Sequence, residues 1–399
     1  MKIKYGLILL AAATLLAGCA GFWNLPASTT TTTTTATTDS SGVFYVLNQT
    51  TKQVAAYFIS SGTLEQVSGS PYNLSSAPNC IAIAPGGGFL YVGTVSGIYL
   101  YTIGSGGALT IGNGGAVISS DIPAAIEVTG SWLIDAFNPN TTGSVQLDAI
   151  PINSSTGAYT GTGSPPYQAF NVTNASVAQM ALSPDGTNLF VALGAGGTIV
   201  VPVTSSNSNP LGSSATVIPV ANSGGSALSV AVDPTDRLFY IGETLANSTA
   251  SSGGLRVFNY SSLGTGTPRS SPSQITGSPI ASGGLSPHAI LPIGSGEYVY
   301  VANGQGNTGT GNITWFPISA SGTTYTIAGG SDIASGVVPV GLAEDSDNNF
   351  VLAVSNGGST ASGDPDLEAF TMSSGALTAN IASKTGTDPV GAVAVAALP

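Results

Sequence analysis

The sequence predicts an all-β protein, a seven-bladed β-propeller of four-stranded blades, on three observations. Short runs of Val, Ile, Tyr and Phe are separated by Gly, Ser, Thr, Asn and Pro, which is the composition of strands joined by turns. Gly supplies 54 of the 399 residues, and charged residues supply only 7%, against roughly 25% in ordinary soluble domains. A strand pattern recurs every 46 to 61 residues, which is the length of a propeller blade.

The first 18 residues have the pattern of a lipoprotein signal peptide. Two lysines precede an apolar stretch, residues 5–16, that is too short to span a bilayer. The Leu-Ala-Gly-Cys sequence that ends at Cys19 resembles a bacterial lipobox, which implies cleavage before Cys19 and lipidation of its thiol. Several acyl chains give stable membrane anchoring. The alternative is an ordinary secretory signal followed by a chance cysteine.

Residues 19–41 predict a tether rather than part of a folded domain. Seven consecutive threonines, residues 29–35, cannot bury a hydrophobic core and stay extended in water. We therefore expect a protein that is lipid-anchored in the bacterial cell envelope, on the periplasmic side or at the cell surface. Ala20 after the lipidated position favours the outer membrane.

The charge of the chain excludes two classes of partner. The net charge is −12, and without Lys2 and Lys4 of the leader, five basic residues remain against 19 acidic ones. Five scattered basic residues are too few to displace the counterions of nucleic acid. The same shortage of positive charge disfavours docking on an anionic membrane. Membrane contact is therefore expected through the lipid anchor only. The acidic surface either binds cations or keeps a weakly charged protein soluble.

The two cysteines are not expected to pair. If Cys19 carries lipid, Cys80 has no partner for a disulfide, even in an oxidising compartment. Cys80 lies in an apolar run, residues 78–83, and is expected to be a small buried hydrophobic residue.

One blade is clearest in residues 81–110. A strand over 81–84 is followed by a Gly-rich turn, a second strand over 89–93, a third over 97–103 and a fourth over 107–110. The same order recurs along the chain, although the copy that includes 132–137 is degenerate. First strands are expected to begin near Pro78, Ala124, Val177, Ser226, Pro287, Pro339 and Pro389.

The seventh blade is expected to be shared between the two ends of the chain. After Pro389 there is room for one strand only, and three strands without a first strand lie at 43–47, 53–58 and 63–65. Pairing the strand after Pro389 with the three strands near the start of the domain closes the ring and removes an open sheet edge. We therefore expect one propeller domain over residues 42–399, and a monomer.

The repeated motif resembles a known family. The pattern Pro-x-x-Ile-Ala-x-x-Pro-x-Gly-x-x-Leu-Tyr-Val, followed by Gly-Ala-Leu-Thr and Gly-Ser-Pro, is similar to the lactonase-like seven-bladed propellers. This family includes the propeller-type 6-phosphogluconolactonases and is close to the Tyr-Val-Thr-Asn repeat proteins. Gly-Ser-Pro recurs at 69–71, 163–165 and 277–279 and matches the connector between blades. The resemblance spans residues 42–399 and implies the fold, with lactone hydrolysis as one expected activity.

The loops are expected to differ between the two faces of the ring. Because neighbouring strands are antiparallel, tight first turns share one face, and the loops after second strands share the other with the starts of the first strands. These loops are long in three consecutive blades, at 243–254, 303–312 and 356–364. They either form a rim around a pocket or have lengthened without consequence.

Three residues are expected to face the channel mouth on the long-loop face. His288, the single histidine, begins a first strand, while Glu243 and Asn303 each end a second strand. His288 and Glu243 are the candidate catalytic residues, and Asn303 is a candidate binding residue. The resemblance implies Pro-Arg-His at the first strand and Asn-Glu at the end of the second. This chain has Pro287-His288-Ala289 and Asn303-Gly304, so the Arg and that Glu are missing.

Two arginines are candidate sources of positive charge. Arg237 lies in a tight turn on the opposite face and is expected to cap it. Arg256 lies within a third strand, 254–258, where it either pairs across strands or faces a ligand as a second binding residue.

No cofactor and no metal are expected. Asp345-Ser346-Asp347 and Asp364-Pro365-Asp366 offer fewer ligands than calcium prefers. The Gly-rich stretches connect strands and open no helix, so they form no phosphate-binding loop.

The sequence favours an envelope-anchored, non-catalytic propeller that binds a small molecule, a glycan or an envelope protein through its loop-rich face. The alternative is a lactone hydrolase of the resembled family. The absent Arg and the single His argue against the enzyme. The fold and the sector with Glu243, His288 and Asn303 argue for it.

Overall fold

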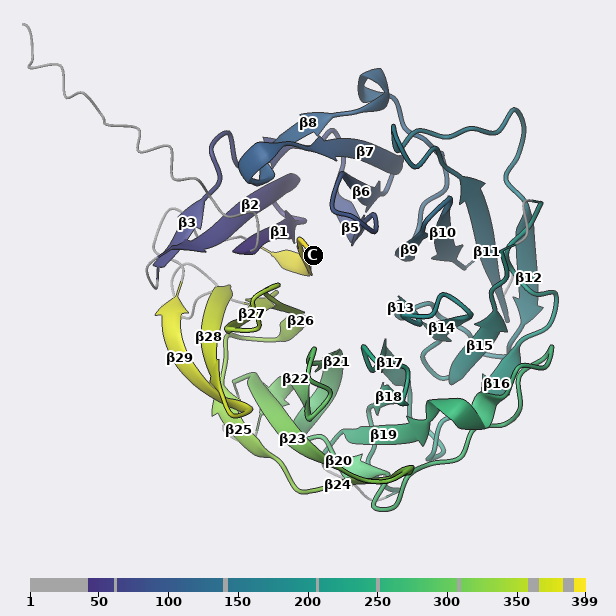
Figure 1. The fold of residues 1–399 in the computed structure, drawn as a ribbon, viewed down its shortest axis with the longest axis vertical. Coiled ribbons are helices and arrows are strands. Elements are labelled where there is room, and N and C mark those ends of the chain that lie inside the picture. The colour runs from purple at the N-terminus through teal and green to yellow at the C-terminus, as the bar shows by residue number, and fades with distance from the viewer. Residues whose placement is uncertain are drawn as a thin grey trace, which may run out of the picture. The chain divides into compact units, whose positions relative to one another are not determined.

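The computed structural model describes residues 42–60, 63–138, 143–205, 208–248, 252–306, 310–357, 366–382 and 391–399. All of them belong to one compact unit, Asp39–Pro399, in which seven antiparallel sheets surround a channel (Figure 1). The predicted signal peptide, Cys19 and the predicted Thr-rich tether lie outside the described residues. Within the described part, no helix is long and apolar enough to cross a membrane.

Six blades follow one another in chain order, each with its first strand nearest the channel. Blade B holds β5 (Pro78–Ile83), β6 (Phe89–Thr94), β7 (Gly97–Ile103) and β8 (Leu109–Ile111). Blade C holds β9 (Ala125–Thr129), β10 (Trp132–Phe137), β11 (Ser144–Pro151) and β12 (Tyr167–Asn171). Blade D holds β13 (Gln179–Leu182), β14 (Asn188–Ala192), β15 (Thr198–Pro202) and β16 (Thr216–Ile218).

The next three blades have the same order. Blade E holds β17 (Ala227–Val232), β18 (Leu238–Glu243), β19 (Gly254–Asn259) and β20 (Ile280–Ala281). Blade F holds β21 (Gly284–Pro292), β22 (Tyr298–Gly306), β23 (Asn312–Ser321) and β24 (Thr324–Ile327), and β25 (Ser331–Ala334) also pairs with β23. Blade G holds β26 (Pro339–Glu344), β27 (Phe350–Ser355), β28 (Leu367–Ser373) and β29 (Ala376–Ala382).

Blade A is shared between the two ends of the chain, as the sequence predicts. Its innermost strand is β30 (Ala392–Ala397), which pairs antiparallel with β1 (Val43–Asn48). The remaining strands are β2 (Gln53–Ser60), β3 (Thr63–Gln66) and β4 (Tyr72–Asn73). The seven-bladed fold is confirmed, and each first strand starts within three residues of its predicted start.

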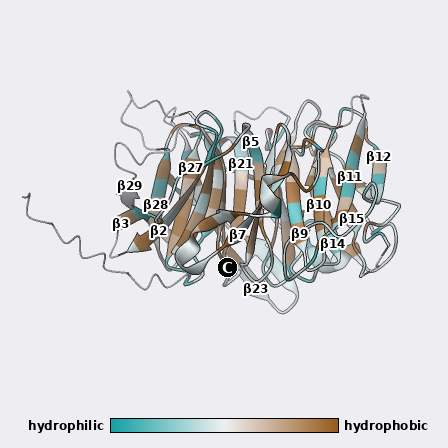
Figure 2. Cartoon of the chain, turned by 90° about the horizontal axis from the view of Figure 1, so that it is seen from above, coloured by the Kyte–Doolittle hydropathy of each residue, from teal (hydrophilic) through white to brown (hydrophobic). Residues whose placement is uncertain are grey.

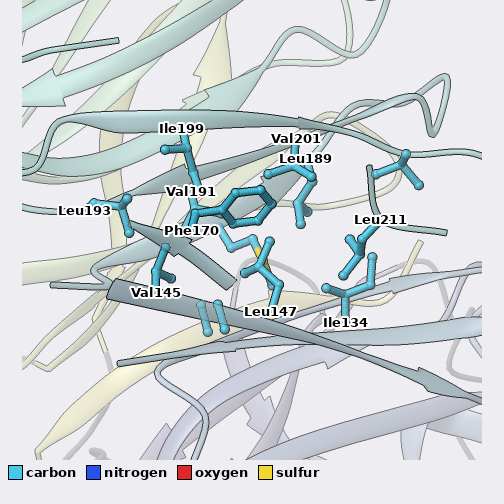
Figure 3. Close-up of a cluster of buried hydrophobic side chains, with 14 of the residues drawn as sticks. Ile134, Val145, Leu147, Phe170, Leu189, Val191, Leu193, Ile199, Val201 and Leu211 are labelled. Carbon is cyan, nitrogen blue, oxygen red and sulfur yellow. The ribbon is translucent and has the colours of Figure 1, made fainter. Parts of the chain in front are cut away.

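Hydrophobic side chains fill the space between neighbouring blades. Between blades C and D, for example, Ile134 and Leu147 of one blade meet Leu189 and Val191 of the next (Figure 3). In Figure 2 the hydrophobic colour is concentrated on the strands, while the loops are paler or hydrophilic. Each sheet buries both faces in this way, so the ring itself is the core. Cys80 is buried and free, as the sequence predicts.

A repeated hydrogen bond fastens one blade to the next. A buried second-strand tyrosine donates its hydroxyl to the carbonyl of a glycine in the turn after the third strand of the following blade. This glycine has a positive φ, which explains why the Gly-Ala-Leu-Thr motif begins with glycine. The three pairs are Tyr45 with Gly107 (2.9 Å), Tyr91 with Gly157 (2.8 Å) and Tyr300 with Gly375 (2.9 Å).

The Gly-Ser-Pro motif also has a structural role. In blade A the hydroxyl of Ser70 accepts the backbone N–H of Ala56 at 2.8 Å, and in blade E Ser278 accepts that of Val257 at 2.8 Å. The serine thus pairs with a strand N–H that would otherwise lack a partner at the sheet edge. In both blades the motif directly precedes the last outer strand, β4 in blade A and β20 in blade E.

Deleting residues 391–399 should abolish cooperative unfolding, because β1 then loses its partner and the ring opens. The measurement is a thermal melt followed by circular dichroism, on the truncated protein and on the mature chain. A synthetic peptide of residues 391–399, added in excess, should restore part of the transition. A truncated protein that melts at the temperature of the full chain would show that β30 does not close the ring.

Candidate functional site

The innermost strands of six blades enclose a cavity of about 280 Å³ at the end of the channel where these strands begin. This is the face predicted to carry the long loops. Four of the lining side chains are polar and hydrophilic, and each comes from a different blade: Asn79, Glu127, Gln179 and His288. The other described lining residues are aliphatic or small, apart from Met180 and Cys80, and none of them is a lysine or arginine.

A repeated β-bulge sets which side chain enters the channel mouth. In β5, β17, β21, β26 and β30 the pairing with the second strand skips one residue near the start of the strand. A bulge leaves that residue unpaired and turns its side chain. The skipped residues are Asn79, Leu228, His288, Val340 and Val393, and all but Leu228 line the cavity. In blades A, B, F and G the bulge residue therefore contributes one lining position to the mouth.

His288 occupies the bulge of blade F and is half-buried. Its imidazole lies against Gly304, where an added Cβ would come within 2.8 Å of Cδ2 and 2.9 Å of Nε2. Glycine at 304 is therefore required for the present position of the ring. Burial lowers the pKa of His288 below its ordinary value, so the imidazole is neutral at pH 7 and can act as acceptor or base.

Glu127 is a site residue that the sequence reasoning missed. It lies on β9 in blade C and lines the cavity. Burial raises the pKa of its carboxyl to about 8, although backbone hydrogen bonds from Val128 and Leu182 oppose the rise. At neutral pH the carboxyl is largely protonated and offers an O–H donor. The signal in the sequence is a lone acidic residue inside the strand Ala-Ile-Glu-Val-Thr.

Two amide side chains complete the polar set, and both also link neighbouring blades. The Oε1 atom of Gln179 accepts the backbone N–H of Val230 at 3.0 Å, which leaves its NH₂ group as the donor toward the cavity. The Nδ2 atom of Asn79 donates to the carbonyl of Pro123 at 3.3 Å, which leaves its oxygen as an acceptor. The cavity thus combines donors and acceptors held in place by the ring.

Glu243 and Arg256 lie inside blade E and do not line the cavity. The two side chains are almost fully buried and form an ion pair, with 2.8 Å between Arg256 Nη1 and Glu243 Oε1. Glu243 Oε2 accepts the backbone N–H of Ala221 at 3.0 Å, and Arg256 donates to the carbonyl of Pro219 at 2.8 Å. The pair therefore anchors the connector from blade D to blade E, and Arg256 pairs across strands, one of its two expected arrangements.

Asn303 is fully buried in blade F. Its Oδ1 accepts the hydroxyl of Ser282 at 2.7 Å, and its Nδ2 donates to the carbonyl of Ser282 and to the hydroxyl of Thr314. Of the three residues expected at one mouth, only His288 lines the cavity. The reason is that the described lining comes from first strands and the residues directly before them, whereas Glu243 and Asn303 on the second strands point into their blades and hold the incoming connectors.

The remaining predicted positions have local structural roles. Arg237 Nη2 lies 2.9 Å from Asp233 Oδ2 and donates to the carbonyl of Gly296 at 2.9 Å, so it caps its turn and also reaches blade F. Asp345 accepts the backbone N–H groups of Asn349 and Phe350. In the described part of the chain, no group of three His, Cys, Asp or Glu side chains could hold a metal ion.

The three long loops are described only in part. Residues 249–251, 307–309 and 358–365 lie outside the described residues, and Asp364-Pro365 lies among them. The described residues that line the cavity all belong to the inner strands or directly precede them.

Replacing Glu243 with alanine should destabilise the fold by about 3–5 kcal/mol, because Arg256 is then buried without a counter-charge. Arg256→Ala should have a similar effect, and the double variant should cost clearly less than the sum of the two. Equilibrium urea unfolding gives the free energies, with the exposed Thr102→Ala as control. Additive single effects, each under about 1 kcal/mol, would contradict a structural role for the pair.

Comparison with known proteins identifies the fold. A candidate 6-phosphogluconolactonase from Bacteroides uniformis superposes with a TM-score of 0.65 at 14% sequence identity, over 89% of this chain and 98% of that one. The periplasmic gluconolactonase PpgL of Pseudomonas aeruginosa superposes with a TM-score of 0.64 at 16% identity, over 90% and 99%. A functionally unknown protein from Desulfotomaculum acetoxidans gives a TM-score of 0.62 at 11% identity, over 89% and 98%.

No family profile and no curated protein sequence matches the chain. At such low identities, the structural likeness establishes the architecture and leaves the chemistry to be argued from the site itself. The chain is a seven-bladed β-propeller similar in fold to lactonase-like propellers.

Proposed function

We propose that the protein is a non-catalytic binding module that takes a small, neutral, polar molecule into the mouth of its channel. The observation that carries this proposal is a cavity of about 280 Å³ whose described lining has polar side chains from four blades and no lysine or arginine. Ligand sites typically combine apolar walls with a few well-placed polar groups. The volume is near the lower end of such sites and suits a molecule the size of a monosaccharide.

The side chains favour a ligand with both donors and acceptors. The NH₂ group of Gln179 and the protonated carboxyl of Glu127 can donate, while the oxygen of Asn79 and the neutral ring of His288 can accept. An anionic ligand would have to lose its hydration without gaining a cation partner, which is costly. We therefore infer a neutral sugar, an aldonolactone or the exposed end of a glycan, and exclude phosphorylated ligands.

Lactone hydrolysis is the second candidate function. Two solved structures of the same fold carry gluconolactonase names, and the neutral imidazole of His288 could activate a water molecule. The chain lacks the arginine of the resembled motif, and no described cation lines the cavity. A phosphorylated lactone would therefore have no partner for its phosphate, so that substrate class is the least favoured.

We further propose that the binding module is exported and held in the cell envelope by lipid on Cys19. The lipobox pattern supports this location, and a neighbour of the same fold is described as periplasmic. The Thr-rich segment would then serve as the spacer between the lipid and the propeller.

Neutral sugars or lactones should raise the melting temperature of the mature protein, whereas gluconate 6-phosphate should not. D-glucose, D-galactose and D-glucono-δ-lactone are the probes, followed by calorimetric titration of any that stabilise. Gln179→Ala should weaken binding about fivefold, the effect of one neutral hydrogen bond. Thr102→Ala, far from the cavity on β7, is the control. If no neutral probe binds, or the phosphate binds better, the proposed ligand class is wrong.

The same preparation distinguishes a binder from an enzyme. We expect no hydrolysis of D-glucono-δ-lactone or 6-phosphogluconolactone above the uncatalysed rate, measured by pH-stat. The control is His288→Ala, because removal of a general base costs roughly 10²–10⁴ in rate. If the wild type hydrolyses a lactone and the variant loses this factor in rate, the protein is a lactonase and the proposed binding function is wrong.

Cys19→Ala should move the protein from the membrane fraction to the soluble fraction, because the acyl chains are the expected anchor. Fractionation of cells followed by immunoblotting measures the distribution, and Cys80→Ala is the control because that thiol is buried in the propeller. Retention of the Cys19 variant in membranes would refute lipidation as the tether.

A further inference from the structure

Blade C buries carboxyl groups that have no positive partner. Asp135 on β10 has no exposed surface, and neither of its carboxyl oxygens accepts a hydrogen bond from the described residues. Asp148 on β11 lies directly opposite Asp135 in the strand register and is also buried. Two aspartates in directly opposed positions of one sheet repel each other when both are charged.

The surroundings of Asp135 offer little compensation for a negative charge, since only the backbone N–H groups of Asp148 and of Asp135 itself, among the described residues, favour its ionised form. Its strand neighbour on β9 is Ile126, and Cys80 on β5 and Asp121 in the preceding connector also lie close enough to interact. Gln146 donates to Asp148 at 2.7 Å, and Ser119 donates to Asp121 at 2.6 Å. The two ion pairs between described residues both belong to blade E.

An ionised Asp135 would therefore be an unpaired buried charge, one of the most costly arrangements in a protein interior. Burial first, and then the charges of Asp148 and Asp121, raise the pKa of Asp135 well above its ordinary value. Burial also raises the pKa of Asp148, which Gln146 partly opposes.

The strand that carries Asp135 also holds the channel strand of its blade. On β10, Asp135 pairs with Ile126 of β9, and the adjacent Ile134 pairs with Glu127. Glu127 lines the cavity at the channel mouth. The strand partner of Asp135 is therefore the immediate neighbour of a residue in the cavity wall.

We propose that blade C is a pH-responsive element of the propeller. The protonated carboxyl of Asp135 keeps β10 packed between β9 and β11, and its deprotonation weakens this packing and loosens the strand that carries Glu127. The proposal rests on the buried, unpartnered position of Asp135 and does not depend on which ligand the channel binds.

The direction of the pH dependence follows from thermodynamic linkage. An aspartate in the unfolded chain has a pKa of about 3.9. Because the pKa of Asp135 is higher in the folded protein, the stabilisation of the fold by its protonated carboxyl is fully present below about pH 3.9. This stabilisation is lost as the pH rises through the folded pKa. Each unit of difference lowers the folding equilibrium constant about tenfold at high pH.

The test is equilibrium urea unfolding of the mature protein between about pH 4 and pH 9, compared with Asp135→Asn. The variant keeps the shape of the side chain without its charge. We expect its urea midpoint to match the wild type at about pH 4 and to exceed it by a growing margin as the pH rises above that value. Glu65→Gln, which neutralises an exposed carboxylate on β3 of blade A, should leave the pH profile unchanged.

Hydrogen exchange shows whether the effect is local. After correction for the intrinsic rate, amides of β9, β10 and β11 should exchange faster at about pH 8.5 than at about pH 5 in the wild type, and by a smaller factor in Asp135→Asn. Asp148→Asn, which removes the neighbouring charge, should also reduce the pH effect. Identical pH profiles for wild type and Asp135→Asn, or equal acceleration in all blades, would overturn the proposal.

Discussion

The antiparallel pairing of β30 with β1 is the constraint on which the rest of the structure depends. Each blade has two hydrophobic faces, and each face is buried only by a neighbouring blade. An open row of seven blades would expose one face at each end and leave an unpaired strand edge. Closing the ring through blade A removes both problems, and it also brings the starts of six inner strands together around one cavity.

Within this ring, two kinds of polar side chain have separate tasks. Residues at the ends of second strands hold the connectors, as Glu243 does with Arg256 and as Asn303 does with Ser282. Residues at the bulges of first strands point into the channel, as Asn79 and His288 do. The binding chemistry is therefore carried by a few positions on the first strands, which suits a fold that hosts many functions.

Much of the fold could be predicted from the sequence, because the period of the strands, the Gly turns and the incomplete blades at both ends all agree. The direction of individual side chains could not. Nothing in the pattern around Glu243 or Asn303 distinguishes a residue at the channel from one that holds a connector, since both lie beside a loop on the same face. Glu127 was missed because blade C is the degenerate copy, where the motif offers no guide and only the lone charge in an apolar strand gives a signal.

The shared blade also has a consequence for the order of folding. The innermost strand of blade A is synthesised after every other strand of the ring, so β1 emerges first and its inner edge waits longest for a partner. Until β30 arrives, the growing chain carries an unpaired apolar edge that can pair with another chain. A protein with this topology therefore gains from factors that keep nascent chains apart until synthesis is complete.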